Sequence, residues 1–418
     1  MNPPPSPNAD PGVRYSELRK QTERLIAGLS AEDCALQSMP EASPVKWHLA
    51  HTTWFFETFV LERYADGYVA PEPAYRYLYN SYYNAVGEQF PRAQRGLISR
   101  PSLADVQQYR DHIDTQMKTL IASGRLPAAA LALIELGINH EQQHQELILT
   151  DIKHLLSLNP LAPAYRDGPW MMNGAAAPLD WTTVEGGVMS IGADSAGFAF
   201  DNELPRNKQY VAPFTIANRL VTNGEYLQFV EDGGYRRPEL WLAEGWITVT
   251  AQGWQAPLYW RQNSGAWQEF TLRGLQSLDP ARPMVHVSQF EADAYVRWAD
   301  ARLPTEFEWE VAAASAPARG NFVESGELHP RVQNQEPLAA MFGDVWEWTQ
   351  SAYAPYPGYR TVEGAVGEYN GKFMSNQYVL RGGSCATPQS HIRATYRNFF
   401  PSAARWQFSG IRLARDAT

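Results

Sequence analysis

Two histidines, His140 and His144, stand four residues apart in the segment INHEQQHQELILTDIKH. Apolar residues recur here at helical spacing, and residues i and i+4 of a helix share a face. Both imidazoles can therefore reach one metal ion. Glu146 lies roughly 200° around the helix from His144, and His154 lies about 15 Å further along it. A third ligand should therefore come from another helix.

A second pair of histidines, His48 and His51, stands one turn apart in WHLAH, inside another helical pattern. Helix bundles build metal sites from side chains on facing helices. We favour His51 as the third ligand, with His48 as its rival. Three imidazole nitrogens with open positions suit Fe(II), Cu(II) or catalytic Zn(II), and ligand type alone does not choose between them. The alternative is that these histidines are ordinary hydrogen-bonded groups.

Tyrosines and arginines lie between the two histidine segments. Tyr82 and Tyr83 are adjacent, and Arg92, Arg95 and Arg100 follow them in a stretch too broken for a clear helix. A phenol near an oxygen-activating metal can donate a proton, and an arginine can bind a substrate carboxylate. The competing interpretation is aromatic packing beside a surface charge cluster.

Long amphipathic helices must position these side chains. Ser43 and Pro44 are typical of an N-cap and a first helical turn, and they precede a helical pattern that runs to Tyr64. Three further segments show the same apolar spacing: Arg14 to Ser30, Ser102 to Ser123 and Pro127 to Leu158. Together the four segments predict an antiparallel four-helix bundle.

The composition changes after about residue 160. Residues 1–160 hold seven of the 30 glycines and two of the 14 tryptophans, but six of the nine histidines. We predict a bundle over 1–160, a linker over the Pro-, Gly- and Ala-rich residues 161–180, and an α+β domain with short strands over 181–418. Within that domain the pattern predicts two helices, Thr222 to Gly233 and Ser288 to Arg302.

Composition narrows the class of protein. A chain of 418 residues favours two domains, and a charge of −10 with no long single-sign block argues against nucleic acid or an anionic membrane as a partner. With no run of eighteen apolar residues and no signal-peptide pattern, we expect a soluble, cytoplasmic protein. Two cysteines, Cys34 and Cys385, are too few for a disulfide framework or a thiolate metal site.

Motifs in both halves resemble known families. The first half looks like a DinB-type four-helix bundle, whose H-x3-H-x-E element is formed here by His140, His144 and Glu146. The second half resembles the formylglycine-generating-enzyme and sulfatase-modifying domain, a C-type-lectin-like fold. In this order the halves are similar to the ergothioneine sulfoxide synthases. The motifs of the second half are RLPTEFEWE (302–310), GDVWEWT (343–349), LRGGS (380–384) and FSGIRLA (408–414).

The resemblance implies a multidomain α and α+β protein and a nonheme Fe(II) enzyme. Such an enzyme uses O2 to join a sulfur donor to imidazole C2 of hercynine (Nα-trimethylhistidine), leaving a sulfoxide. Carried over by position, His51, His140 and His144 would be the iron ligands, because WHLAH matches the family's first-helix histidine at its second His.

The resemblance also implies substrate contacts. Gln143 would contact hercynine, and Asn398 and Phe399 fall where relatives hold its carboxylate and quaternary ammonium. Arg405, in the same segment, is a further predicted substrate contact. Two more residues, Tyr82 and Tyr83, correspond to the tandem tyrosines of the cysteine-using branch, where one supplies a proton; we favour Tyr83.

One segment departs from the family pattern. Relatives of the cysteine-using branch carry RHPRPQRG after the tandem tyrosines, whereas this chain has EQFPRAQRG. Gln89 and Phe90 replace the basic pair. We predict that these two residues contact the donor, together with Arg92 and Arg95. Loss of positive charge would suit a neutral selenosugar, the donor of the related selenoneine synthases. We expect cysteine as the donor, with a selenosugar as the alternative.

The sequence is also compatible with two other functions. A DinB-like thiol transferase would use a divalent metal without O2, and a binding module would use the lectin-like half with a structural metal. Dependence on both Fe(II) and O2 separates the synthase from both.

Overall fold

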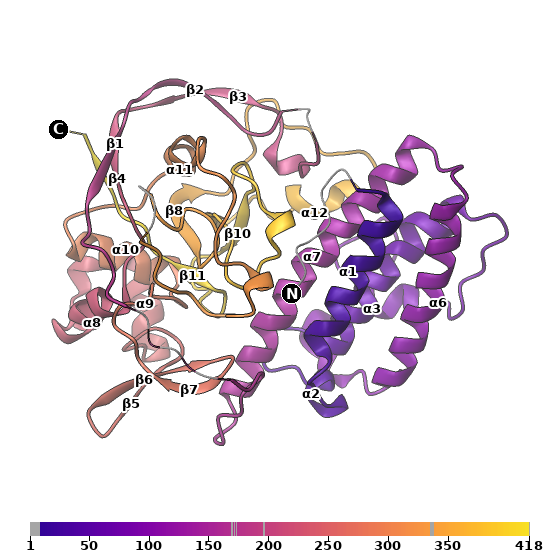
Figure 1. Cartoon of the computed structure of the whole chain (residues 1–418), viewed down its shortest axis with the longest axis horizontal. Helices are drawn as coiled ribbons and strands as arrows, with labels where there is room; N and C mark the ends of the chain where they lie inside the picture. Colours follow the sequence, from indigo (N-terminus) through magenta and orange to yellow (C-terminus); the bar gives the residue numbers. More distant parts are fainter. Residues whose placement is uncertain are drawn as a thin grey trace. The chain divides into compact units, whose positions relative to one another are not determined.

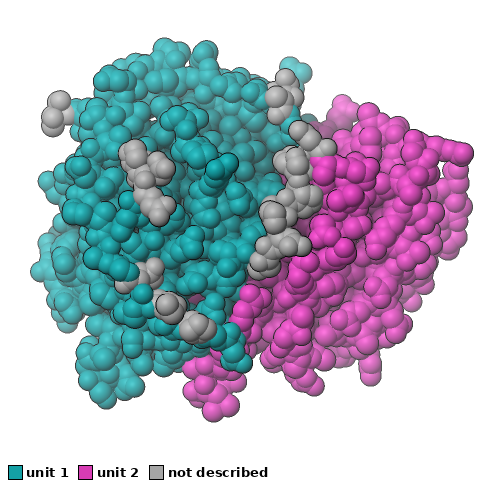
Figure 2. All heavy atoms as spheres, in the orientation of Figure 1, with its two compact units in different colours: residues 1, 167–361, 370–418 teal, residues 2–166, 362–369 magenta. Residues whose placement is uncertain are grey.

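The computed structural model describes residues 9–168, 170, 172, 174–194, 197–334 and 338–417. The predicted linker 161–180 includes residues 169, 171 and 173, which lie outside this set. The chain forms two compact units (Figure 2). Among the described residues, the bundle unit holds 9–166 and 362–369, and the C-terminal unit holds those within 167–361 and 370–417.

The bundle unit contains the four long predicted helices (Figure 1). A π-helical turn, Glu57–Leu61, follows α3 without a break, so one helical run extends from 45 to 64. Packing joins α1 to α7, and α3 to both α6 and α7. The helices are α1 (Pro11–Ile26), α2 (Ala31–Ala35), α3 (Val45–Phe56), α4 (Glu62–Tyr64), α5 (Tyr75–Leu78), α6 (Leu103–Ala122) and α7 (Ala128–Ser157).

Local sequence explains where these helices begin. Ser102 caps α6 in a capping box with Asp105, whose carboxylate accepts the Ser102 amide at 2.8 Å. Prolines precede α3 and α7, at Pro44 and Pro127, where a missing N–H costs no helical hydrogen bond.

A short segment from late in the sequence completes the bundle unit. Residues 362–369 lie with the bundle, although the sequence interpretation left them in the C-terminal domain. The Glu368 carboxylate accepts the amides of Asn84 and Ala85 at 3.1 and 2.8 Å. These bonds hold the segment against the loop that carries the tandem tyrosines.

The C-terminal unit contains four small sheets. Their strand orders are β1-β4-β12, β10-β9-β8-β11, β2-β3 and β5-β6-β7. In the second sheet β11 runs parallel to β8, and the other neighbours are antiparallel. The strands are β1 (Trp181–Val184), β2 (Gly187–Ile191), β3 (Asn207–Val211), β4 (Phe214–Ala217), β5 (Trp260–Asn263), β6 (Ala266–Thr271), β7 (Gly274–Ser277), β8 (Trp346–Ala352), β9 (Gln377–Arg381), β10 (Asn398–Pro401), β11 (Ser409–Gly410) and β12 (Ala414–Asp416).

The prediction of two helices in this unit was incomplete. Both expected helices form, as α8 (Asn223–Glu231) and α10 (Gln289–Trp298). The described residues also form α9 (Ala243–Gln252), α11 (Glu306–Ala313) and, at the boundary of the units, α12 (Glu368–Gly371). In α9 the run ITVT has strand-like residue types, so propensity hid the helix. In α11 a Thr305 capping box marks the start of only eight residues, too few for a periodic signal.

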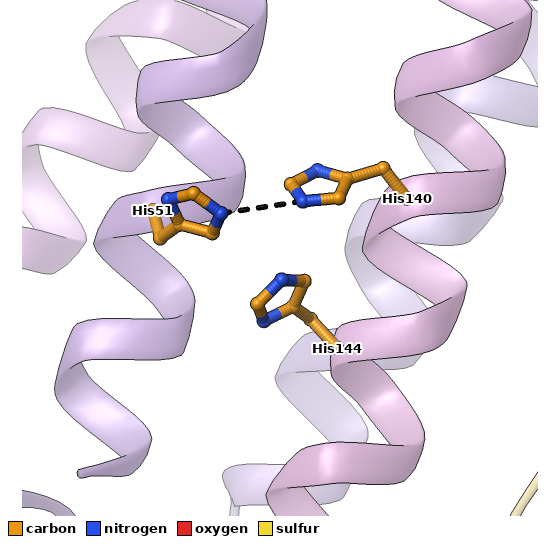
Figure 3. A group of neighbouring side chains, drawn as sticks. All are labelled: His51, His140 and His144. Atoms are coloured by element: carbon orange, nitrogen blue, oxygen red, sulfur yellow. Dashed lines mark hydrogen bonds between the residues drawn. The ribbon is translucent and has the colours of Figure 1, made fainter. Parts of the chain in front are cut away.

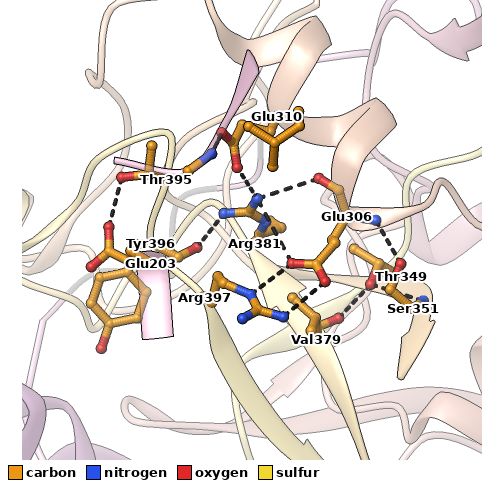
Figure 4. Close-up of polar contacts among 12 residues, drawn as sticks. Glu203, Glu306, Glu310, Thr349, Ser351, Val379, Arg381, Thr395, Tyr396 and Arg397 are labelled. Carbon is orange, nitrogen blue, oxygen red and sulfur yellow. Dashed lines mark hydrogen bonds and ion pairs between the residues drawn. The ribbon is translucent and has the colours of Figure 1, made fainter. Parts of the chain in front are cut away.

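Buried ion pairs hold the C-terminal unit together (Figure 4). Arg397 makes two hydrogen bonds to Glu306, at 2.8 and 2.9 Å, and Arg381 pairs with Glu310. These four side chains are buried. Because Arg397 directly precedes β10, its pairing anchors the strand that carries Asn398 and Phe399.

None of the helices in the described part of the chain is long and apolar enough to cross a bilayer.

Candidate metal centre

Three histidines from two helices converge in the bundle (Figure 3). His51 comes from α3, and His140 and His144 come from successive turns of α7. Each offers one ring nitrogen, and these nitrogens lie within 4.8 Å of one another. Nε2 of His51 is 3.2 Å from Nε2 of His140. The i, i+4 pair and the second-helix histidine thus meet as the sequence pattern predicts.

A glycine allows α3 and α7 to approach closely beside this cluster. A Cβ at Gly137, one turn before His140, would lie 2.5 Å from the Phe56 ring and 2.9 Å from the Phe55 ring. Contacts below 3.0 Å would push the helices apart, so the absent side chain lets α3 bring His51 to the face of α7.

Aromatic rings enclose the three histidines. His51 stacks between Trp47 and Trp54, with ring centroids 4.5 and 5.6 Å away and interplanar angles of 13° and 15°. Phe55 packs on His140 with centroids 4.8 Å apart. The rings hold the imidazole planes, and the burial of the three histidines strengthens electrostatic interactions at the site.

The buried histidines are held neutral. Burial lowers the pKa of His140 to about 4, and burial together with His140 lowers the pKa of His51 and of His144 well below the ordinary value. Nδ1 of His51 donates to the Tyr79 carbonyl at 2.6 Å, which leaves Nε2 of the neutral ring with its lone pair directed at the cluster. Neutral imidazole is the form that binds metals.

His48, the rival to His51, lies behind the cluster. Its Nδ1 is 2.8 Å from Nδ1 of His144, and its Nε2 is 3.0 Å from Oδ2 of Asp151. Both ring nitrogens are therefore engaged, and His48 is not among the three convergent side chains. Spacing alone left the two histidines open, and the geometry selects His51 as the candidate ligand.

The tandem tyrosines occupy different environments. Tyr83 is buried, and its ring packs against the rings of Trp54, Phe55 and Phe59, at centroid distances of 5.8, 6.5 and 5.1 Å. Tyr82 is half-buried, and its hydroxyl accepts a hydrogen bond from Arg92 at 2.5 Å. Two of these rings, Trp54 and Phe55, themselves pack against His51 and His140.

The structure adds a tyrosine that sequence reasoning missed. Tyr369, in the segment 362–369, has its ring centroid 6.4 Å from that of His140, at an interplanar angle of 81°. Its ring also lies 6.1 Å from Tyr82. Burial raises the pKa of the Tyr369 phenol, so the phenol keeps its proton at neutral pH. No local pattern around Tyr369 points to the histidines, because the contact joins segments far apart in the chain.

The two predicted donor-binding arginines differ in burial. Arg95 is buried, stacks 3.4 Å above the Trp47 ring, and donates to the hydroxyls of Ser43 and Ser81 at 2.9 and 3.0 Å. Burial lowers the pKa of Arg95 to about 9, so the guanidinium remains charged at pH 7. Arg92 is exposed and also donates to the Glu41 carbonyl.

The two residues that depart from the family pattern make neutral contacts within the bundle unit. Gln89 donates to the Asn84 side chain at 3.0 Å, and the Phe90 ring packs against Tyr77 at 6.0 Å. Gln143, half-buried, directly precedes His144 on α7.

The remaining predicted contacts belong to the C-terminal unit. Asn398 and Phe399 begin β10, and Phe399 stacks on Tyr353 with centroids 4.1 Å apart. Arg405 lies 4.1 Å from the Trp254 ring and 3.2 Å from the Glu291 carboxylate. These contacts orient the Arg405 guanidinium, and its role in substrate binding stays a prediction.

The three-histidine cluster fits a metal ion. Its donors are neutral nitrogens, they come from rigid helices, and three protein ligands leave coordination positions for other molecules. In the described part of the chain, no other three His, Cys, Asp or Glu side chains bring their ligand atoms this close together. Fold and site together define a helix bundle with a candidate three-histidine metal centre, joined to a mixed α+β domain.

Comparison with known proteins identifies the family. Residues 14–148 match the DinB superfamily, and residues 175–336 and 332–417 match the sulfatase-modifying factor enzyme 1-like domain. Hercynine oxygenases from Mycobacterium tuberculosis and Mycolicibacterium thermoresistibile are each 33% identical, over 96% of this chain and 97% and 93% of theirs. Ergothioneine biosynthesis protein 1 of Schizosaccharomyces pombe is 27% identical over 52% of this chain and 28% of its own length.

The chain belongs to the hercynine oxygenase family and is an oxygenase-type enzyme. This placement confirms the fold class and the family that the sequence motifs predict.

Proposed function

We propose that this chain acts in ergothioneine biosynthesis as an Fe(II)- and O2-dependent sulfoxide synthase that joins cysteine to hercynine. The sulfur would bond to imidazole C2, and O2 would supply the sulfoxide oxygen and one molecule of water, which takes the hydrogens lost from the thiol and from C2. Full-length relatives named hercynine oxygenase support the substrate. The observation that carries the proposal is the buried, neutral three-histidine cluster.

His51, His140 and His144 would hold the metal ion through ring nitrogens. When bound, Fe(II) would supply the one-electron chemistry that O2 needs to react with closed-shell substrates, and it suits imidazole ligands. The tryptophans that sandwich His51 would keep its ring oriented and the site dry.

A phenolic proton donor would direct the reaction toward C–S bond formation. Tyr369 is our candidate, because its ring packs directly against His140. Its Oη would deliver a proton while Tyr82, beside it, holds Arg92. Tyr83 remains the alternative proton donor, and its ring packs on Trp54 and Phe55.

Arg95 supports a donor with a carboxylate. The described hydrogen bonds of this buried guanidinium go to two neutral hydroxyls, and a buried charge is stabilised by an opposite charge. Asp151 acts on the guanidinium electrostatically, and the carboxylate of cysteine would add a direct partner. Gln143, Asn398 and Phe399 would contact hercynine, with the aromatic face of Phe399 toward the trimethylammonium group.

A selenosugar donor is the second candidate, and we propose it on one observation. Gln89 and Phe90 put an amide and an apolar ring where the cysteine-using relatives carry a basic pair. A neutral donor needs less positive charge around it. With a selenol donor, selenium would bond to imidazole C2 of hercynine, and O2 would take up the hydrogens of the selenol and of C2 as water while supplying a selenoxide oxygen.

The test is product analysis after anaerobic reconstitution with Fe(II). The protein is mixed with hercynine and either cysteine or a selenosugar, exposed to air, and analysed by mass spectrometry. We expect a cysteine–hercynine sulfoxide that requires both Fe(II) and O2. A selenium adduct formed only with the selenosugar would reassign the donor, and product formed without O2 or with Zn(II) would favour a thiol transferase.

A further inference from the structure

Behind the three-histidine cluster, a second polar layer runs from α7 to α3 and back. Asp151, on α7, accepts from the Ser43 amide at 2.8 Å and lies 3.0 Å from Nε2 of His48 on α3. Nδ1 of His48 is 2.8 Å from Nδ1 of His144, back on α7. Asp151, His48 and His144 are all buried, with exposed fractions of 6, 2 and 8%.

The order of donors and acceptors in this layer follows from the carboxylate. An ionised Asp151 can only accept, so the His48 nitrogen facing it, Nε2, must carry a hydrogen. In a neutral His48 ring the other nitrogen, Nδ1, is then an acceptor. The nitrogen that faces it, Nδ1 of His144, must therefore be the donor.

This order of donors and acceptors determines which nitrogen of His144 can bind a metal ion. A neutral His144 with its hydrogen on Nδ1 has its lone pair on Nε2, the nitrogen left for a metal ion. The opposite tautomer would place a hydrogen on Nε2 and block coordination. Ligating histidines in proteins commonly have their second nitrogen fixed by such a partner.

We propose that Asp151 and His48 are positioning residues that set the His144 tautomer required for metal binding. The inference rests on the three-histidine metal site of the proposed function. It gives His48 a defined role beside the metal ion, without making it a ligand.

The first test reads the tautomer directly in the metal-free protein. The full-length chain is labelled with ¹⁵N-histidine, and His144 is assigned by comparison with His144→Gln. We expect ring ¹⁵N shifts of a neutral imidazole protonated at Nδ1. Shifts of the Nε2-protonated form would overturn the proposal, and this measurement needs no substitution in the second layer.

The second test measures Co(II) affinity of the full-length chain from its absorption bands. His48→Leu removes the acceptor and should weaken Co(II) binding about 10- to 100-fold, the usual cost of losing an outer partner. His48→Gln can still accept through Oε1 and should restore most of the affinity. In Asp151→Asn the side-chain amide oxygen can still accept from His48, so this variant should likewise bind Co(II) more tightly than Asp151→Ala. His112→Ala, an exposed residue on α6, is the matched control.

Two outcomes would overturn the role of the second layer. Affinity in His48→Leu equal to that of the unmodified protein would show that the layer does not act on the site, and equal losses in His48→Leu and His48→Gln would indicate packing alone. By contrast, unchanged Co(II) binding in His51→Ala would show that the three-histidine cluster is not the metal site, and the proposed function would fail with it.

Discussion

The two units bury polar side chains in opposite ways. In the C-terminal unit, buried arginines lie against carboxylates, as in Arg412 with Glu347 at 2.8 Å and Arg397 with Glu306. At the centre of the bundle, three neutral imidazoles direct nitrogens at one another. Opposite charges satisfy each other inside the protein, whereas three convergent imidazole nitrogens offer lone pairs that a bound cation would satisfy together.

A single helix shows both arrangements. His140 faces the histidine cluster, while the next residue of α7, Glu141, is bonded to Arg19 and Arg110. Burial alone would raise the pKa of Glu141, but Arg110 and Arg19 hold it at about 2. Burial therefore does not distinguish a structural polar group from a functional one; complementarity of the partners does.

The largest effect expected is loss of metal from the bundle. His140→Ala should weaken metal binding by more than about 100-fold, beyond the cost of an outer-layer change, and reduce product to background. The midpoint of thermal unfolding of the apo protein should change little, because no buried charge is left unpaired. Metal titration and calorimetry check both points. His154→Ala, on the same helix, is the control, and a large loss of apo stability in His140→Ala would contradict this view.

In the C-terminal unit, removing one buried charge should lower stability and leave metal affinity unchanged. Arg412→Met leaves Glu347 buried without its cation, and we expect a loss of about 3–5 kcal/mol in the free energy of unfolding. Urea denaturation measures it. The double variant Arg412→Met, Glu347→Leu should recover part of the loss, since no charge then remains unpaired. A metal affinity that fell along with stability would break the contrast between the units.

The smallest effect concerns the phenols. Tyr369→Phe should shift product from the sulfoxide adduct toward oxidised donor by about tenfold, less than the roughly 10²- to 10⁴-fold typical of a lost general acid, because Tyr82 and Tyr83 remain nearby. Tyr83→Phe should change the product ratio far less, because the Tyr83 ring contacts Trp54 and Phe55, the rings that pack on the histidines. Mass spectrometry of both products gives the ratio, and a dominant effect of Tyr83→Phe would return the role to that residue.

Much of the site could be predicted because its signals are local. The four-residue spacing of His140 and His144 places them on one face of α7 in any helix that forms there. Apolar periodicity likewise predicts the four long helices. The short helices α9 and α11 were not predicted. The residue types of α9 are typical of strands, and α11 is too short to show a helical period.

What remained depends on how elements meet. Whether His48 or His51 joins His140 and His144 is decided by the rotation of α3 about its axis and by its close approach at Gly137, neither of which spacing on one helix encodes. Tyr369 joins the site because Glu368 binds the amide of Asn84, 284 residues away in sequence. The periodicity of a helix fixes which side chains share a face; only packing between helices and distant segments decides what that face meets.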